Sequence, residues 1–156
     1  MVVITGVLST LAVVGFGRHM RAARGAEATG VMLAIRSGEE SYMAENHLYL
    51  SVSTGTNWYP QLVPSNKRYS FVSSTHPDYA RWRRLAPPVN GMVMFGYLVT
   101  AGVPGTKPAI SGMTNAPVFA AQPLDWYVIQ ALGTSNGKSS RYAFSSMTGE
   151  MYVEGE

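Results

Sequence analysis

The sequence predicts an α+β fold in which a long N-terminal helix packs, through its C-terminal half, against an antiparallel β-sheet head. Two observations predict it. No proline precedes Pro60, and residues 18–46 are rich in Ala, Met, Leu and Glu, which favour helix. All nine prolines lie between Pro60 and Pro123, and most aromatic residues follow Ser51. We therefore expect two parts, a helix over residues 1–46 and a β-rich head over residues 47–156.

The composition bounds the classes of function. Charged residues make up 13% of the 156-residue chain, whereas about 25% is usual. This shortage argues against a disordered or coiled-coil chain and suggests that part of the surface is buried in an assembly. The net charge of +3 is too weak to indicate a nucleic-acid partner. The absence of cysteine excludes disulfides, zinc–thiolate sites and thiol chemistry.

The start of the chain, Met1–Gly17, contains no charged residue and is followed by Arg18, Arg21 and Arg24. Four interpretations stay open. The segment could be a cleaved secretory signal, although it has no basic start and no small-residue cleavage site. It could be a membrane anchor, at the lower limit of about 17–20 apolar residues. It could be a buried core helix, which its glycines disfavour, or the beginning of the natural chain is missing.

The helix is expected to continue to Asn46 as one rod of about 70 Å, at 1.5 Å per residue. A head of this size is only about 30–40 Å across, so the helix must project, and its apolar first half needs lipid or other copies of the chain. Residues at spacings of three and four form the stripe that should face the head, and Arg36 and Glu40 are spaced for an ion pair. The stripe consists of Ala28, Met32, Ile35, Glu39 and Tyr42.

The head is expected to contain five strands with the alternation typical of a sheet. They are Arg68–Ser73, Met92–Thr100, Asp125–Leu132, Arg141–Met147 and Glu150–Val153. The polar segment Gly133–Ser140 is predicted to be a loop that joins two strands as a hairpin, and Thr148-Gly149 a tight turn. Residues 101–123, with four prolines and three glycines, are predicted to be a long irregular excursion, a kind of loop that often carries recognition.

The sequence offers no constellation for catalysis. His19, His47 and His76 lie far apart, no recognised nucleotide or hydrolase motif is present, and Asp78 and Asp125 are the only acids between Asn46 and Glu150. We expect no catalytic residue, no cofactor, no bound metal and no small-molecule substrate, and we interpret His47 as a helix cap or surface residue.

One basic–aromatic cluster stands out: Arg81, Trp82, Arg83 and Arg84. It could grip phosphates and stack on the bases of DNA. The alternative is a solvated basic turn with a half-buried tryptophan, which we favour because phosphate binding usually recruits a broader basic surface.

Residues 1–50 resemble the N-terminal helix of type IV pilins and the related pseudopilins. An apolar run ends in a small-residue break at residues 14–17, and a basic turn and the small residues 25–28 follow. Residues 39–46, Glu-Glu-Ser-Tyr-Met-Ala-Glu-Asn, resemble the family's Gln-Glu-Ser-Tyr end, before Tyr49-Leu50. Residues 125–156 also resemble the closing sheet of pilin-like proteins.

This chain departs from the family pattern at its start. The family's leader peptide, the glycine before its cleavage site and the glutamate near the mature N-terminus are absent. The N-terminal methylation and the assembly role of that glutamate therefore cannot be placed on any residue. Either the start of the chain is set too late, or the chain is not processed. Gly15 and Gly17 stand where relatives have a proline, as a possible helix break or as sites of close helix approach.

The resemblance implies a structural subunit of a type IV pilus-like filament, held first in inner-membrane lipid and then in a cell-surface filament. Its partners would be copies of itself or other pilins. The alternatives are a type II secretion pseudopilin in a periplasmic pseudopilus, or a minor pilin whose head binds DNA or a surface ligand. An apolar set is expected to pack the filament core: Val2, Val3, Ile4, Val7, Leu8, Leu11, Val13, Val14 and Phe16.

Overall fold

The structure, a computed structural model, describes residues 2–135 and 137–155 and, in the first helix, the side chains of residues 19, 20 and 22–46. Helix α1 spans Val2–Asn46 and α2 spans Tyr79–Leu85. The strands are β1 (Tyr69–Ser70), β2 (Met92–Val93), β3 (Gly96–Gly102), β4 (Trp126–Ser135), β5 (Lys138–Ser145) and β6 (Met151–Glu154).

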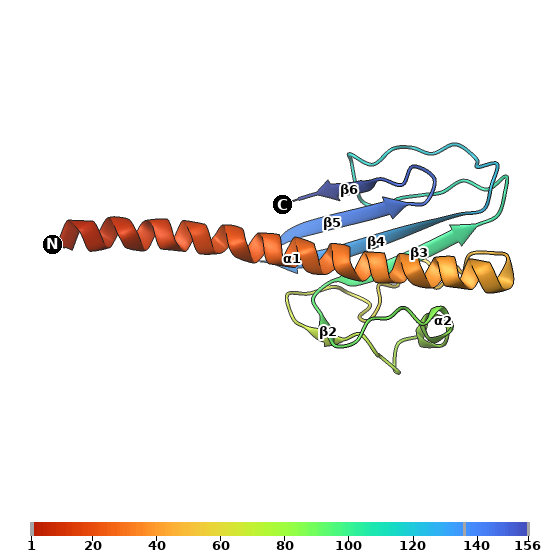
Figure 1. Cartoon of the computed structure of the whole chain (residues 1–156), viewed down its shortest axis with the longest axis horizontal. Coiled ribbons are helices and arrows are strands. Elements are labelled where there is room, and N and C mark those ends of the chain that lie inside the picture. Colours follow the sequence, from red (N-terminus) through yellow and green to blue (C-terminus); the bar gives the residue numbers. More distant parts are fainter. Residues whose placement is uncertain (1, 136, 156) are drawn as a thin grey trace.

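The predicted α+β layout is confirmed. Strands β3-β4-β5-β6 form a four-stranded antiparallel sheet in that order, and the second half of α1 lies along one face of it (Figure 1). The helix runs opposite to β4, because Arg24 bonds to Ser135 at the end of β4 whereas Glu40 bonds to Tyr127 at its start. The first half of α1 projects away from the head (Figure 1).

The predicted stripe on α1 is the face that meets the sheet. Ala28, Met32, Ile35 and Glu39 are fully buried and Tyr42 is half-buried. The expected ion pair between Arg36 and Glu40 is not formed, because the sheet offers both side chains other partners. The guanidinium of Arg36 lies 5.0 Å from the centre of the Phe144 ring, and the Tyr127 hydroxyl donates to Glu40 over 2.8 Å.

Helix α1 ends at Asn46, where His47 takes a left-handed conformation (φ 58°). Its N–H donates to the carbonyl of Met43 over 2.8 Å. This bond satisfies one of the carbonyls left free at a helix end, so the interpretation of His47 as an exposed cap is confirmed.

Two of the expected strands are shorter or divided. The pairing predicted over Arg68–Ser73 is confined to β1, and Met92–Thr100 is split into β2, which pairs with β1, and β3, which joins the main sheet. The division falls at Met94, whose N–H donates to the carboxylate of Glu27 on α1 over 2.6 Å. A helix side chain thus takes the backbone group that a continuous strand would use.

The hairpin predicted at Gly133–Ser140 is confirmed, but the predicted length of its loop is wrong. Strands β4 and β5 continue to Ser135 and from Lys138, so residues 136 and 137 alone connect them. The sequence there is Asn-Gly, which favours two-residue hairpin turns, and Gly137 has a positive φ of 74°. Strands β5 and β6 begin and end near the expected positions.

The excursion between β3 and β4 is irregular, as predicted, but it covers the second face of the sheet; we call residues 103–125 the strap. The Trp126 indole N–H donates to Thr106, and the Ser111 N–H donates to the buried Gln130. Farther on, the N–H groups of Thr114 and Asn115 both donate to Glu154 on β6. The sheet is therefore sandwiched between α1 and the strap.

Candidate functional site

The projecting part of α1 is the first candidate surface; we call residues 2–23 the stalk. Among the described side chains, the first to bond to the head is that of Arg24, so the stalk extends about 33 Å beyond it. The apolar side chains predicted to pack a filament core, from Val2 to Phe16, lie outside the described side chains. Within the described residues, no helix combines the length and the apolar character needed to cross a bilayer.

The helix is continuous through Gly15 and Gly17. Neither glycine therefore breaks α1 in the isolated chain. Loss of helicity at this point inside an assembly stays a prediction.

The basic–aromatic cluster lies on α2, and the structure corrects the prediction for its aromatic residue, Trp82. Trp82 is only 2% exposed and stacks on Tyr59, with ring centres 4.7 Å apart, while its edge contacts Phe71. It is neither half-buried nor able to stack on a nucleic-acid base, because Tyr59 already covers its face.

The three arginines of α2 point to solvent. Arg81 donates to Thr54 over 2.7 Å and lies 3.9 Å from Asp78. Arg84 donates to the Tyr42 hydroxyl over 3.2 Å, whereas Arg83 has no hydrogen bond or ion pair to any described residue. A basic surface is therefore present on α2, but without an exposed aromatic ring beside it.

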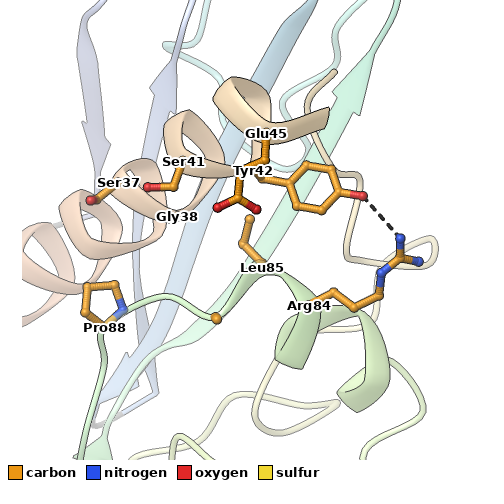
Figure 2. Close-up of a pocket in the computed structure, with 9 residues that line it drawn as sticks. Ser37, Gly38, Ser41, Tyr42, Glu45, Arg84, Leu85 and Pro88 are labelled. Carbon is orange, nitrogen blue, oxygen red and sulfur yellow. Dashed lines mark hydrogen bonds between the residues drawn. The ribbon is translucent and has the colours of Figure 1, made fainter. Parts of the chain in front are cut away.

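A groove of about 300 Å³ runs between α1 and the end of α2 (Figure 2). Ser37, Ser41 and Glu45 form the α1 wall, and the Arg84–Tyr42 hydrogen bond closes one end. The lining includes no histidine and no carboxylate pair, so it holds no acid–base machinery. Gly38 lines the groove floor, where an added Cβ would lie 3.0 Å from the carbonyl oxygen of Leu85. This glycine therefore allows α2 to approach α1 closely.

Glu39 is the one acid on the buried stripe, and it is 0% exposed. Its Oε2 accepts the N–H of Leu50 over 2.9 Å, whereas Oε1 has no hydrogen-bond partner among the described residues. Burial raises the pKa of this carboxyl from 4.5 to about 7; the Leu50 N–H acts in the opposite direction, and the charge of Glu40 adds to the rise. The sequence placed Glu39 on the stripe but gave no sign of its acceptor role.

The side chains of His76 and Asp78 form hydrogen bonds with neighbouring parts of the head. The Nδ1 of His76 accepts the N–H of Asp78, so its Nε2 donates to the carbonyl of Trp58 over 2.9 Å. The Asp78 carboxylate accepts both the N–H and the hydroxyl of Thr54. Within the described part of the chain, no three His, Cys, Asp or Glu side chains gather as metal ligands would.

The geometry defines a class of architecture: a small α+β head carried on a helix that extends well beyond it. No family model, curated protein or solved structure matches the chain.

Proposed function

We propose that this chain is a structural subunit of a type IV pilus-like filament and has no catalytic role. One observation carries the proposal: α1 continues as a single helix about 33 Å beyond the head, and residues 2–17 of this helix include no charged residue. No described part of the head lies beside this part of the helix (Figure 1). Its apolar side chains would enter inner-membrane lipid first and then a filament at the cell surface.

The mechanism is exchange of one apolar environment for another. In lipid the stalk contacts acyl chains, and in a filament it contacts equivalent stalks of other copies. Because lipid and helix are similarly apolar, close van der Waals packing decides the exchange. Gly6, Ser9, Ala12 and Gly15 recur along the stalk at helical spacing and permit close approach.

The head would travel as a rigid unit on this helix. Glu27 joins α1 to the head twice, through a 3.1 Å ion pair with Arg68 and a 2.6 Å bond from the Met94 N–H. The buried stripe, and the contacts of Arg24, Arg36 and Glu40 with the sheet, hold the rest of the helix. Movement of the stalk would therefore be transmitted to the head without an intervening hinge.

The test is Leu11→Asp, assayed by the amount of the chain recovered in sheared surface filaments of its native host. A carboxylate at the centre of an apolar span costs about 3 kcal/mol, so we expect incorporation to fall at least tenfold. The matched control is Leu62→Asp, because Leu62 is 50% exposed on the head. Normal incorporation of Leu11→Asp, with the head folded in both variants, would refute the filament role.

A type II secretion pseudopilin, in a periplasmic pseudopilus, would use the same stalk. The two assignments separate by which secretion or pilus system loses function when the chain is deleted, and by which other pilins co-purify with it.

The exposed arginines of α2 favour a second candidate, a minor pilin whose head holds DNA. Contact would be with phosphates alone, since Trp82 is buried. Replacing Arg81, Arg83 and Arg84 with Gln should then reduce DNA retention and its salt dependence. Retention that does not change with these substitutions or with salt would remove this candidate.

A further inference from the structure

Basic side chains gather where the stalk meets the head. Arg24 on α1 bonds to Ser135 at the end of β4. Ser135 pairs with Lys138 at the start of β5, so Lys138 lies at the same level of the helix. The β4–β5 turn thus brings a second cation to the first turn of α1 that touches the head.

Two further cations reach this level from another segment. Arg68 forms its 3.1 Å ion pair with Glu27, three residues beyond Arg24 on α1, and Lys67 precedes it. In Figure 1 the segment around β2 lies below α1, whereas β4 and β5 run behind it. The cations therefore reach one level of the helix from three segments of the chain, and we call Arg24, Lys67, Arg68 and Lys138 the basic collar.

The carboxylates near the collar are already engaged. Glu27 accepts from both Arg68 and the Met94 N–H. Glu154, opposite Arg141 on β5, accepts from Thr114 and Asn115 of the strap. Lys67 and Lys138, by contrast, are exposed and have no ion pair with any described residue. The collar therefore retains a positive charge.

The opposite end of the head differs. Glu40 and Glu45 lie near the end of α1, and Glu40 meets Tyr127, which follows Asp125 by two residues. Arg81, Arg83 and Arg84 of α2 also lie at this end, where Arg84 contacts Tyr42, but these acids and Asp78 offset their charge. On the stalk side of the collar, the same helix carries Arg18 and Arg21. The net positive charge is thus greater at the end of the head that faces the apolar stalk.

We propose that the basic collar binds the anionic headgroups of a phospholipid membrane that the stalk enters. This inference rests on the proposed function, in which the stalk occupies lipid before assembly. With Val2–Gly17 in lipid, Arg24 would stand about 10 Å beyond the end of the apolar segment, which is within reach of the headgroup layer and close to the Debye length of about 8–10 Å at physiological salt. Cations that gather at one level along a helix suit a plane perpendicular to that helix, whereas a nucleic-acid strand would follow a line.

The experiment is flotation of the full chain with vesicles of neutral phosphatidylcholine and with vesicles that also contain phosphatidylglycerol. The variant is Lys67→Gln with Lys138→Gln, chosen because both side chains are exposed. The matched control is Arg83→Gln with Lys107→Gln, which removes two exposed charges at the other end of the head. Each cation near an anionic surface strengthens binding by up to about fivefold.

We expect the preference for anionic over neutral vesicles to fall about tenfold in the collar variant, to stay unchanged in the control, and to weaken as salt is added. If this preference falls equally in both variants, only the net charge of the chain matters. If it falls in neither variant, the collar does not contact lipid. Each result overturns the inference. Failure to float with any vesicle would also contradict entry of the stalk into lipid. If both proteins bind neutral vesicles and the collar variant prefers anionic vesicles as strongly as the wild type does, the collar is refuted and the entry of the stalk into lipid is not.

Discussion

Replacing the buried carboxyl of Glu39 by an amide should change how stability depends on pH. In the folded chain the pKa of this group is about 7, and 4.5 is its ordinary value. The folded state therefore binds the proton more tightly than the unfolded state between these two values. This tighter binding stabilises the folded state in full below about pH 4.5; the stabilisation declines as the pH rises toward 7 and is lost above it. The difference between the two pKa values corresponds to about 3 kcal/mol of unfolding free energy.

The informative property of Glu39→Gln is how its unfolding free energy changes with pH, rather than its value at one pH. The amide of Gln does not titrate, so the variant should lack the loss of about 3 kcal/mol that the wild type shows from about pH 4.5 to pH 8. Its carbonyl can still accept the Leu50 N–H. Its NH₂ group would replace Oε1, which has no partner among the described residues, and a buried unpaired donor costs about 1–3 kcal/mol at every pH.

The assay is urea unfolding of the full chain in a nonionic detergent at several pH values, followed by tryptophan fluorescence. Glu45→Gln is the matched control, because Glu45 is an exposed acid on the same helix and has no hydrogen bond or ion pair to any described residue. The unfolding free energy of Glu39→Gln relative to that of the wild type should therefore rise with pH, from about 1–3 kcal/mol below the wild type near pH 4.5 to about equal or higher near pH 8. Parallel pH profiles for these two proteins would show that Glu39 is not the group that holds the proton.

Two other substitutions test the packing of the head. Trp82→Ala should lower the free energy of unfolding by about 3–5 kcal/mol, because it removes a buried indole stacked on Tyr59, whereas Arg83→Ala next to it should change it by less than about 0.5 kcal/mol; equal effects would contradict the burial of Trp82. Tyr127→Phe removes the hydroxyl that donates to Glu40 and should cost about 1 kcal/mol in the same urea assay, so an unchanged midpoint would mean that this bond adds nothing.

The helix and its orientation could be predicted because both depend on local spacing. Residues three and four apart on a helix share a face, so Ala28, Met32 and Ile35 identified the buried stripe without knowledge of the sheet. Glu39 occupied the same stripe, and its burial could be expected from position alone. Its hydrogen bond could not, because Leu50 returns to the helix only through the conformation of His47.

The short helix α2 was missed because its sequence is dominated by three arginines. Trp82 and Leu85, three residues apart, form a small apolar face, but seven residues are too few for periodicity to separate a helix from a turn. What fixes this helix is packing on Tyr59 and Phe71, which come from earlier parts of the chain. The division of β2 from β3 has a similar origin, since the Glu27 side chain reaches Met94 from 67 residues away.

The faces and edges of the sheet are largely covered, which limits the surfaces through which this chain could assemble. Both faces are occupied from within the chain, by α1 and by the strap. The β3 edge bonds to earlier residues, through the Ser53 N–H to Val99 and the bridge between Tyr59 and Tyr97, and Asn115 caps part of the β6 edge. Edge-to-edge pairing of sheets needs a free row of backbone groups, and these contacts shorten both rows. No described part of the head lies beside the stalk (Figure 1), so the proposed filament would form through helix packing rather than through strand addition.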